Sequence, residues 1–162
     1  MGVERRGRIF LSVQSIHHFF VFAMISIRSP FEQLVGCYHL PRLIDKVRLH
    51  LSDQLPPEYG RAFCHPRGLD GTFLSHFGLS SESMVEAIGQ LATDEAVGEW
   101  FAGSVEDFAD RREAWAVLGP RLGLPGEPMH DVFQWALENV YTECRDPARN
   151  TVFQVLDWDE GR

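Results

Sequence analysis

The sequence has few cysteines and nothing that would cross-link the chain. Its 162 residues contain three cysteines at wide spacing, Cys37, Cys64 and Cys144, and no CxxC pair. An odd, scattered set of this kind excludes a disulfide framework and is typical of a protein in the reducing cytoplasm. A single domain of this length buries roughly 70% of its unfolded surface, so it needs no such cross-link.

The sequence also lacks an excess of positive charge. Its formal net charge is −8. Non-specific binding to nucleic acid or to an anionic membrane requires a basic face, so we expect neither as a partner. Only a membrane role for the first 27 residues stays open. A protein partner or a small ligand is compatible with this composition.

Motifs for cofactors and metals are missing as well. Glu127-x-x-His130 has the spacing of half a helical di-iron site, but no second copy occurs in the chain. The glycines from Gly119 to Gly126 follow an expected helix, are interrupted by prolines and lack the lysine of a phosphate-binding loop. We therefore expect no metal and no cofactor.

Residues 1–27 differ in character from the rest of the chain. Basic residues precede a hydrophobic run over residues 9–27, but polar residues and two histidines interrupt that run. A membrane span needs about 20 largely apolar residues, and no small-residue cleavage site follows the run. We favour Met24 as the true initiator, which would make residues 1–23 translated upstream sequence. An amphipathic membrane-surface segment and a cleaved or structural segment are the alternatives.

From residue 28 onward, proline and glycine punctuate short helical patterns. Apolar residues recur every three to four positions, no useful alternating run is present, and residues 56–69 form an expected loop. We predict an all-α fold, a compact bundle of about six to eight short helices in one domain over residues 28–162. Trp100, Trp115 and Trp135 are expected in its core. The expected helices cover 30–35, 40–55, 70–77, 81–91, 94–103, 105–118, 128–143 and 147–158.

Helix boundaries are suggested by individual capping residues. Ser80 or Ser81 and Thr93 are expected to open helices, and Gly78 is expected to end one. Asp70 is expected to cap the helix over residues 70–77. Ser104 with a carboxylate three residues later resembles a capping box.

The segment after residue 40 has the clearest amphipathic pattern. Its polar residues Arg42, Asp45 and Lys46 fall opposite an apolar stripe. We interpret them as a solvated face with local ion pairs, with an anion-binding or partner-docking face as the alternative. The stripe consists of Leu40, Leu43, Ile44, Val47 and Leu51.

The long polar loop is the other place where a site is expected, because function tends to lie on loops held by a rigid scaffold. It contributes Glu58 and Tyr59, with Asp70 at its end. Cys64 beside His65 pairs a thiol with an imidazole, but sequence neighbours usually point apart, which favours a structural or exposed role. The candidate ligand or partner site is therefore Arg42, Asp45, Lys46, Glu58, Tyr59 and Asp70.

The acidic end of the chain complements the basic residues near residue 42. We hypothesise that the tail over residues 157–160 folds back on Arg42 and Lys46, with Arg162 pairing elsewhere. Truncation after Leu156 should then lower thermal stability, and an unchanged melting temperature would contradict the hypothesis.

Two stretches carry a resemblance to a known family. The stretch LPRLIDKVR at residues 40–48 resembles the opening signature of a bacterial family of unknown function, and LDWDEGR at residues 156–162 is similar to its usual end. The family is catalogued as domain-of-unknown-function family five thousand and sixty-nine. Residues 64–68 depart from its usual Cys-Pro pattern. The resemblance implies a domain from about residue 28 to 162 and leaves the activity open.

Two functions are compatible with these observations. We favour a small, soluble, non-catalytic binding or adaptor protein, because no reactive residues converge in the sequence; it would show an exposed apolar groove or a stable partner. The alternative is a small enzyme or small-ligand receptor that uses the loop over residues 58–70 with the helix face of Arg42 and Asp45. It would show a pocket at which those side chains meet.

The late start can be tested on the protein from its native host. If translation begins at Met24, mass spectrometry finds no peptide from residues 1–23. A peptide that covers residues 8–24 would contradict this prediction.

Overall fold

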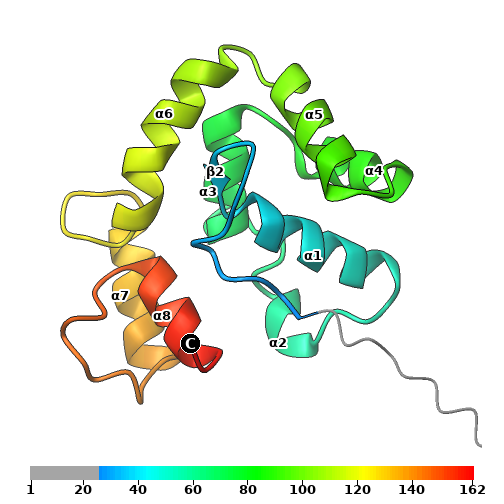
Figure 1. Cartoon of the computed structure of the whole chain (residues 1–162). Helices are drawn as coiled ribbons and strands as arrows, with labels where there is room; N and C mark the ends of the chain where they lie inside the picture. The colour runs from blue at the N-terminus through cyan, green and yellow to red at the C-terminus, as the bar shows by residue number, and fades with distance from the viewer. Residues whose placement is uncertain (1–25) are drawn as a thin grey trace, which may run out of the picture.

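The computed structural model describes residues 26–162, and the expectations for the leader and for Met24 lie outside the described residues. Within this range the chain forms eight α-helices and one two-stranded hairpin, which confirms the predicted all-α class (Figure 1). None of the described helices is both long enough and apolar enough to span a bilayer. The elements are β1 Gln33–Leu34, β2 Cys37–Tyr38, α1 Leu40–Leu51, α2 Pro57–Gly60, α3 Leu69–Phe77, α4 Ser81–Gln90, α5 Asp94–Ser104, α6 Phe108–Leu118, the 3-10 turn η1 Gly119–Arg121, α7 His130–Asn139 and α8 Val152–Asp159.

Helix α1 is the central element of the fold. Every residue from Leu40 to Val47 is buried, and the helix packs against α4 and the hairpin. The expected apolar stripe is buried along most of its length, but its last member, Leu51, is 50% exposed. Proline at the second position of α1 is tolerated because the first turn of a helix leaves its N–H groups unpaired.

The expected helix over residues 30–35 is wrong, because this segment forms a turn and the hairpin. Gln33 pairs with Tyr38 and Leu34 with Cys37, so only Val35 and Gly36 lie in the loop. Both have positive φ, 48° and 77°, as a two-residue type I′ hairpin turn requires. Gly36 allows this turn without backbone strain at its position, because glycine adopts left-handed dihedral angles without a steric penalty.

The capping predictions were right at three helix ends and wrong at two. The side chains of Ser80 and Thr93 accept hydrogen bonds from the first turns of α4 and α5, and Gly78, at φ +69°, ends α3. Asp70 does not cap α3, because its carboxylate is bound elsewhere. The capping box expected at Ser104 is absent too, because Ser104 is the last residue of α5 and α6 begins only at Phe108.

The C-terminal helices are shorter than expected. Helix α7 ends at Asn139, and α8 begins only at Val152. The start of α8 is fixed by a capping box, in which Thr151 and Gln154 each bind the other's backbone N–H.

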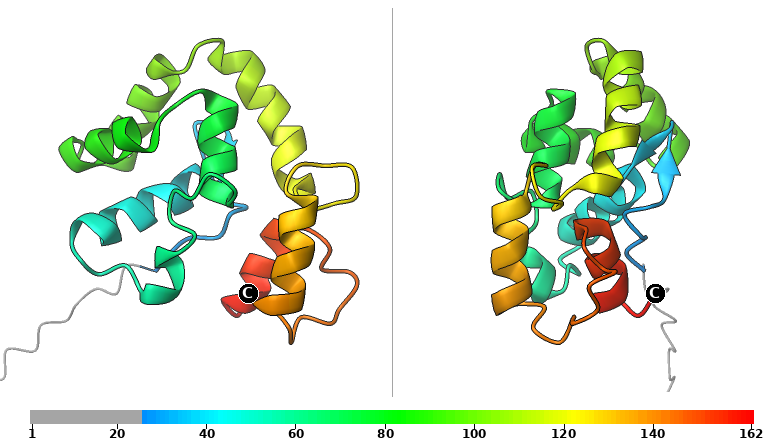
Figure 2. Two further views of the ribbon diagram at one scale, coloured as in Figure 1. Left: turned by 180° about the vertical axis from the view of Figure 1, so that it is seen from behind. Right: turned by 90° about the vertical axis from the view of Figure 1, so that its left-hand side faces the viewer.

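Aromatic side chains from three helices fill the core. Phe73 of α3 stacks on Phe101 of α5 and contacts the edge of Trp115 of α6, with ring centroids 5.6 and 5.4 Å apart. The expected core position is wrong for Trp135, which is 59% exposed. Helix α6 leads away from this core to α7 and α8, which form the other end of the molecule (Figure 2).

The buried stripe of α1 can be tested with one matched pair of variants. Leu43→Ala removes a fully buried side chain and should lower the free energy of unfolding by about 2–5 kcal/mol. Leu51→Ala, in the same helix at an exposed position, should change it by less than about 1 kcal/mol. Urea denaturation measures both, and equal effects would contradict the assignment of the core face.

Candidate functional site

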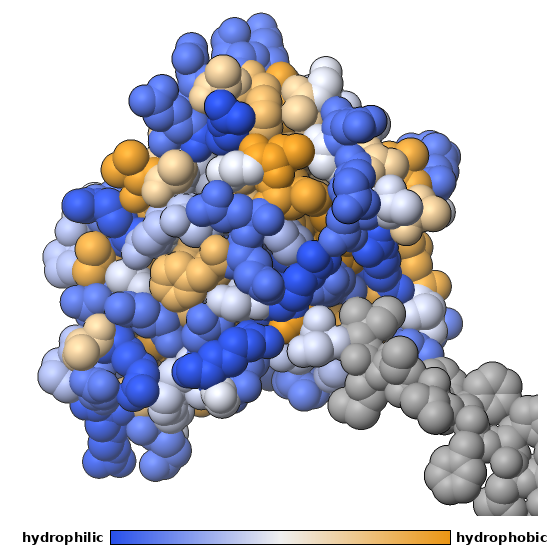
Figure 3. Space-filling model, in the orientation of Figure 1, coloured by the Kyte–Doolittle hydropathy of each residue, from blue (hydrophilic) through white to orange (hydrophobic). Residues whose placement is uncertain are grey.

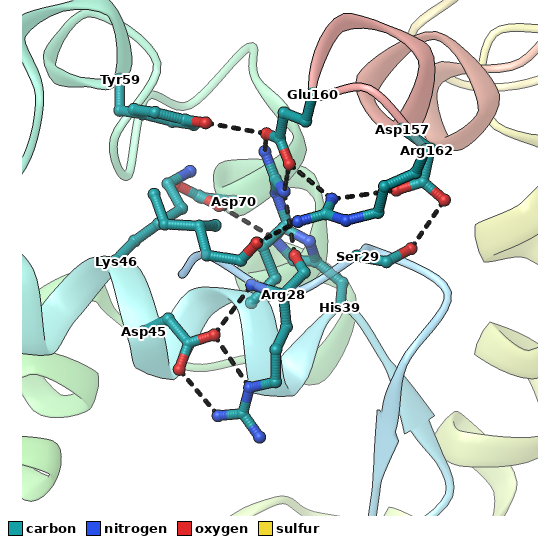
Figure 4. A network of polar contacts seen from close by, with 12 residues as sticks. Arg28, Ser29, His39, Asp45, Lys46, Tyr59, Asp70, Asp157, Glu160 and Arg162 are labelled. Carbon is teal, nitrogen blue, oxygen red and sulfur yellow. Dashed lines mark hydrogen bonds and ion pairs between the residues drawn. The ribbon is translucent and has the colours of Figure 1, made fainter. Parts of the chain in front are cut away.

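The polar face of α1 is not solvated, which corrects the interpretation from the sequence. Arg42, Asp45 and Lys46 are only 2%, 5% and 4% exposed. Buried charges must be paired, because an isolated ion in the interior costs several kcal/mol. Each of the three is indeed paired, and each has a different partner. Figure 4 labels Asp45 and Lys46 together with their partners Arg28 and Asp70.

Lys46 belongs to a cluster centred on the fully buried carboxylate of Asp70. Its Nζ lies 2.5 Å from one carboxylate oxygen of Asp70, and Nε2 of His39 lies 2.8 Å from the other. The backbone N–H of Cys64 donates a third hydrogen bond at 2.9 Å. His39 and Cys64 both have left-handed backbones, with φ 72° and 52°, so the cluster is held by residues in strained conformations.

Charge within this cluster is fixed by its surroundings. Burial alone would raise the pKa of Asp70, but Lys46 and the hydrogen bond from His39 outweigh it and hold that pKa far below its usual range. Burial lowers the pKa of His39 to about 4 against the opposing effect of Asp70, and Lys46 repels a second positive charge. The imidazole is therefore neutral at pH 7. It donates from Nε2, and its Nδ1 is buried with no partner among the described residues.

Arg42 is paired with the C-terminal tail. Its guanidinium donates to both carboxylate oxygens of Glu160, at 2.5 and 2.9 Å, and the same carboxylate accepts from the hydroxyl of Tyr59 at 2.9 Å. The predicted return of the tail to α1 thus occurs at Arg42 but not at Lys46. Arg162 binds Glu160 and Asp157 within the tail.

Asp45 takes part in a second group of ion pairs, which is linked to Arg42 through a 3.0 Å hydrogen bond from its guanidinium to the backbone carbonyl of Arg28. Its carboxylate accepts two hydrogen bonds, both of 2.8 Å, from the guanidinium of Arg28. Arg28 also binds Asp94 of α5, which in turn pairs with Arg48. This network ties the segment before the hairpin to α1 and α5.

A cavity of about 1090 Å³ lies between α1 and α2 on one side and α7 and α8 on the other. Of the six residues proposed from the sequence, all but Asp45 border it, so the structure brings five of them together. Hydrophilic side chains predominate on the face of the molecule seen in Figure 3, with hydrophobic ones in patches between them. The apolar walls of the cavity are contributed largely by Leu49, Leu69, Met129, Val132, Phe133, Ala136, Val140, Val155 and Leu156.

Sequence reasoning missed several residues at this cavity. His39 was treated as isolated, because no sequence pattern shows that this residue, which precedes α1 with a left-handed backbone, turns its side chain toward Asp70. Tyr141 also borders the cavity, with its pKa raised by burial and by Asp159 nearby. No local sequence pattern identifies Tyr141, because it reaches the cavity only through the tertiary fold.

Cys37 and Cys64 are poor nucleophiles, and neither Cys64–His65 nor His130 forms a reactive pair among the described residues. Burial raises the pKa of Cys64 to about 11 and that of Cys37 to about 12, so both are protonated thiols at neutral pH. Cys64 and His65 share no hydrogen bond in the described part of the chain, and His130 binds the carbonyl of Gly123. Residues 26–162 hold no group of three or more side chains able to bind a metal.

The Asp70 cluster predicts a defined loss of stability in acid. The pKa of His39 is about 4 in the folded chain and about 6.5 in the unfolded chain. Between these pH values the unfolded chain therefore binds a proton at His39 that the folded chain does not bind. The free energy of unfolding should fall by about 3 kcal/mol between pH 6.5 and 4. Below about pH 4, protonation of Asp70 should lower it further.

The matched variant is His39→Asn, since asparagine tolerates a left-handed backbone and does not titrate. Urea denaturation at a series of pH values should show a flatter slope between pH 6.5 and 4 for this variant. The same slope in both proteins would rule out His39 as the titrating group.

Comparison with known proteins agrees with the resemblance seen in the sequence. The family described as "Domain of unknown function (DUF5069)" matches residues 25–162, which is most of the chain and includes both α1 and the tail that binds it. No curated protein matches the chain. The chain therefore belongs to the DUF5069 family.

Proposed function

We propose that this protein binds a small organic molecule in the cavity between α1, α2, α7 and α8. The observation that supports this most directly is the convergence of Arg42, Lys46, Tyr59 and their partners on one concave space with largely apolar walls. A few polar groups in a mainly apolar hollow are the usual composition of a ligand site. A volume of about 1090 Å³ is ample for a metabolite-sized molecule.

This proposal favours the receptor alternative over the adaptor. A receptor requires the candidate polar residues to meet at a pocket, whereas an adaptor allows them to be scattered over the surface. Five of the six meet at the cavity, from α1, from α2, which forms within the expected loop, and from the first turn of α3. The exposed apolar residues, such as Leu51, Val117 and Trp135, lie on different helices and give less support to a docking groove.

Within this alternative, binding is better supported than catalysis. A general base or nucleophile must reach the reacting atom of a bound substrate. His39 and Asp70 are completely buried, and the neighbouring thiol of Cys64 is held protonated. Arg42 and Glu160 are already engaged with each other. These groups shape and support the cavity wall and are poorly placed to react.

A cytoplasmic location fits this proposal. The three cysteines are all free, although Cys64 and Cys144 are each only partly buried. Free thiols of this kind persist most readily in a reducing compartment. Oxidation would have to be excluded by measurement of the free thiol content in protein isolated without reductant.

The proposal is tested with Nile red, an uncharged dye whose fluorescence rises in apolar surroundings. One dye should bind per chain. Ala136→Trp, which places a bulky side chain on the α7 wall, should weaken binding about tenfold or more. Ala62→Trp narrows the cavity from the opposite side and should act in the same direction.

The control is Ala116→Trp, at an exposed position on α6 away from the cavity. It should bind the dye as the unaltered protein does. The proposal fails if the dye does not bind, or if all three tryptophan variants bind it equally well. The melting temperature of each variant shows whether weaker dye binding comes from a filled cavity in a folded chain or from a misfolded chain.

A further inference from the structure

We infer that the molecule bound in this cavity is an organic cation, an ammonium group carried on an apolar body. The inference rests on the proposed function and adds the chemical class of the ligand. It follows from which charges at the cavity are already paired, and from the aromatic rings beside those that are not.

The positive charges that border the cavity are already neutralised. Arg42 is bound to Glu160, Lys46 to Asp70, and Arg162 to Glu160 and Asp157. An anionic ligand would have to displace one of these carboxylates to reach a cation. For Lys46 that means disrupting a fully buried ion pair, which typically costs several kcal/mol.

Two carboxylates at the cavity, in contrast, have no basic partner within residues 26–162. Glu58 and Asp159 both border the cavity at exposed positions, and neither forms an ion pair within residues 26–162. Burial raises the pKa of Asp159, and the carboxylates of Glu160 and Glu58 raise it further, against the opposing effect of Arg42. The repulsion among these carboxylates is relieved when a cation enters between them.

Two aromatic rings border the cavity together with the unpaired carboxylates. Tyr59 and Tyr141 border the same cavity, and the electrostatic influence of Asp159 reaches both hydroxyl groups. The guanidinium of Arg42 already sits over the ring of Tyr59, 5.8 Å from its centroid. Aromatic faces combined with carboxylates are typical of sites for organic ammonium ions, because the ring quadrupole attracts positive charge.

The rest of the cavity determines the remainder of the ligand. Val132, Ala136 and Leu156 present apolar surface from α7 and α8, which suits a hydrocarbon or aromatic body. The ligand is therefore expected to place its charged end near Glu58 and Asp159, and its apolar end against these helices. A small inorganic cation would leave the apolar walls without a partner.

Three probes of nearly equal size test the class of ligand: phenethylamine, phenethyl alcohol and phenylacetate. Each is titrated against the full chain with Nile red bound. Phenethylamine should displace the dye at a concentration about tenfold lower than phenethyl alcohol, and phenylacetate should be the weakest. The preference for the amine should shrink at high salt, because screening weakens exposed charge pairs.

A double variant, Glu58→Gln with Asp159→Asn, should abolish the preference for phenethylamine and leave displacement by phenethyl alcohol unchanged. Glu113→Gln, which removes an exposed carboxylate on α6 away from the cavity, should keep the preference. The inference is overturned if phenylacetate displaces the dye as well as the amine does, or if the double variant keeps the preference. In either case the proposed function stands as long as the dye binds; if the dye does not bind, both fail.

Discussion

The structure depends on one buried carboxylate. Asp70 is completely removed from solvent and remains ionised because Lys46, His39 and the backbone of Cys64 all donate to it. These donors come from the middle of α1, from the residue that precedes α1, and from the loop before α3. An ionised carboxylate in the interior tolerates little displacement of its partners, so it fixes α1 and α3 relative to each other. It accounts for the burial of Lys46 on the polar side of α1, as Glu160 and Arg28 do for Arg42 and Asp45.

The cavity is a consequence of this arrangement. One side of α1 packs into the aromatic core, and another carries Arg42 and Lys46 toward α7 and α8. The far wall is held in place by Glu160, whose carboxylate binds Arg42 and Tyr59 at once. Burial would raise the pKa of Glu160, but these contacts lower it, so the carboxylate is charged when it joins the two walls. A single helix thus supports both the core and the candidate site.

The sequence predicted what depends on local chemistry. The caps at Ser80 and Thr93 and the stripe of α1 follow from hydrogen-bonding groups and spacing that are visible within a few residues. Helical spacing also revealed the polar face of α1. It did not reveal that this face is buried, because the periodicity of a helix does not show which other segments pack against its polar side. The tail contact at Arg42 was inferred from complementary charge, whereas the hairpin around Gly36 was missed because strands of two residues leave no alternating pattern. The walls from α7 and α8 exist only once the chain has folded.

The pairing of charges at the cavity bears on how a ligand can bind without disturbing the fold. Each buried pair, Lys46 with Asp70 and Arg42 with Glu160, is satisfied before any ligand arrives. A ligand that meets only Glu58, Asp159 and the tyrosine rings breaks none of these pairs, so the protein needs little reorganisation to accept it. Binding energy is then not consumed in rearrangement, which is the advantage of a preorganised site. In the binding mode proposed above, the paired charges hold the walls of the cavity, and the unpaired ones at its edge select the ligand.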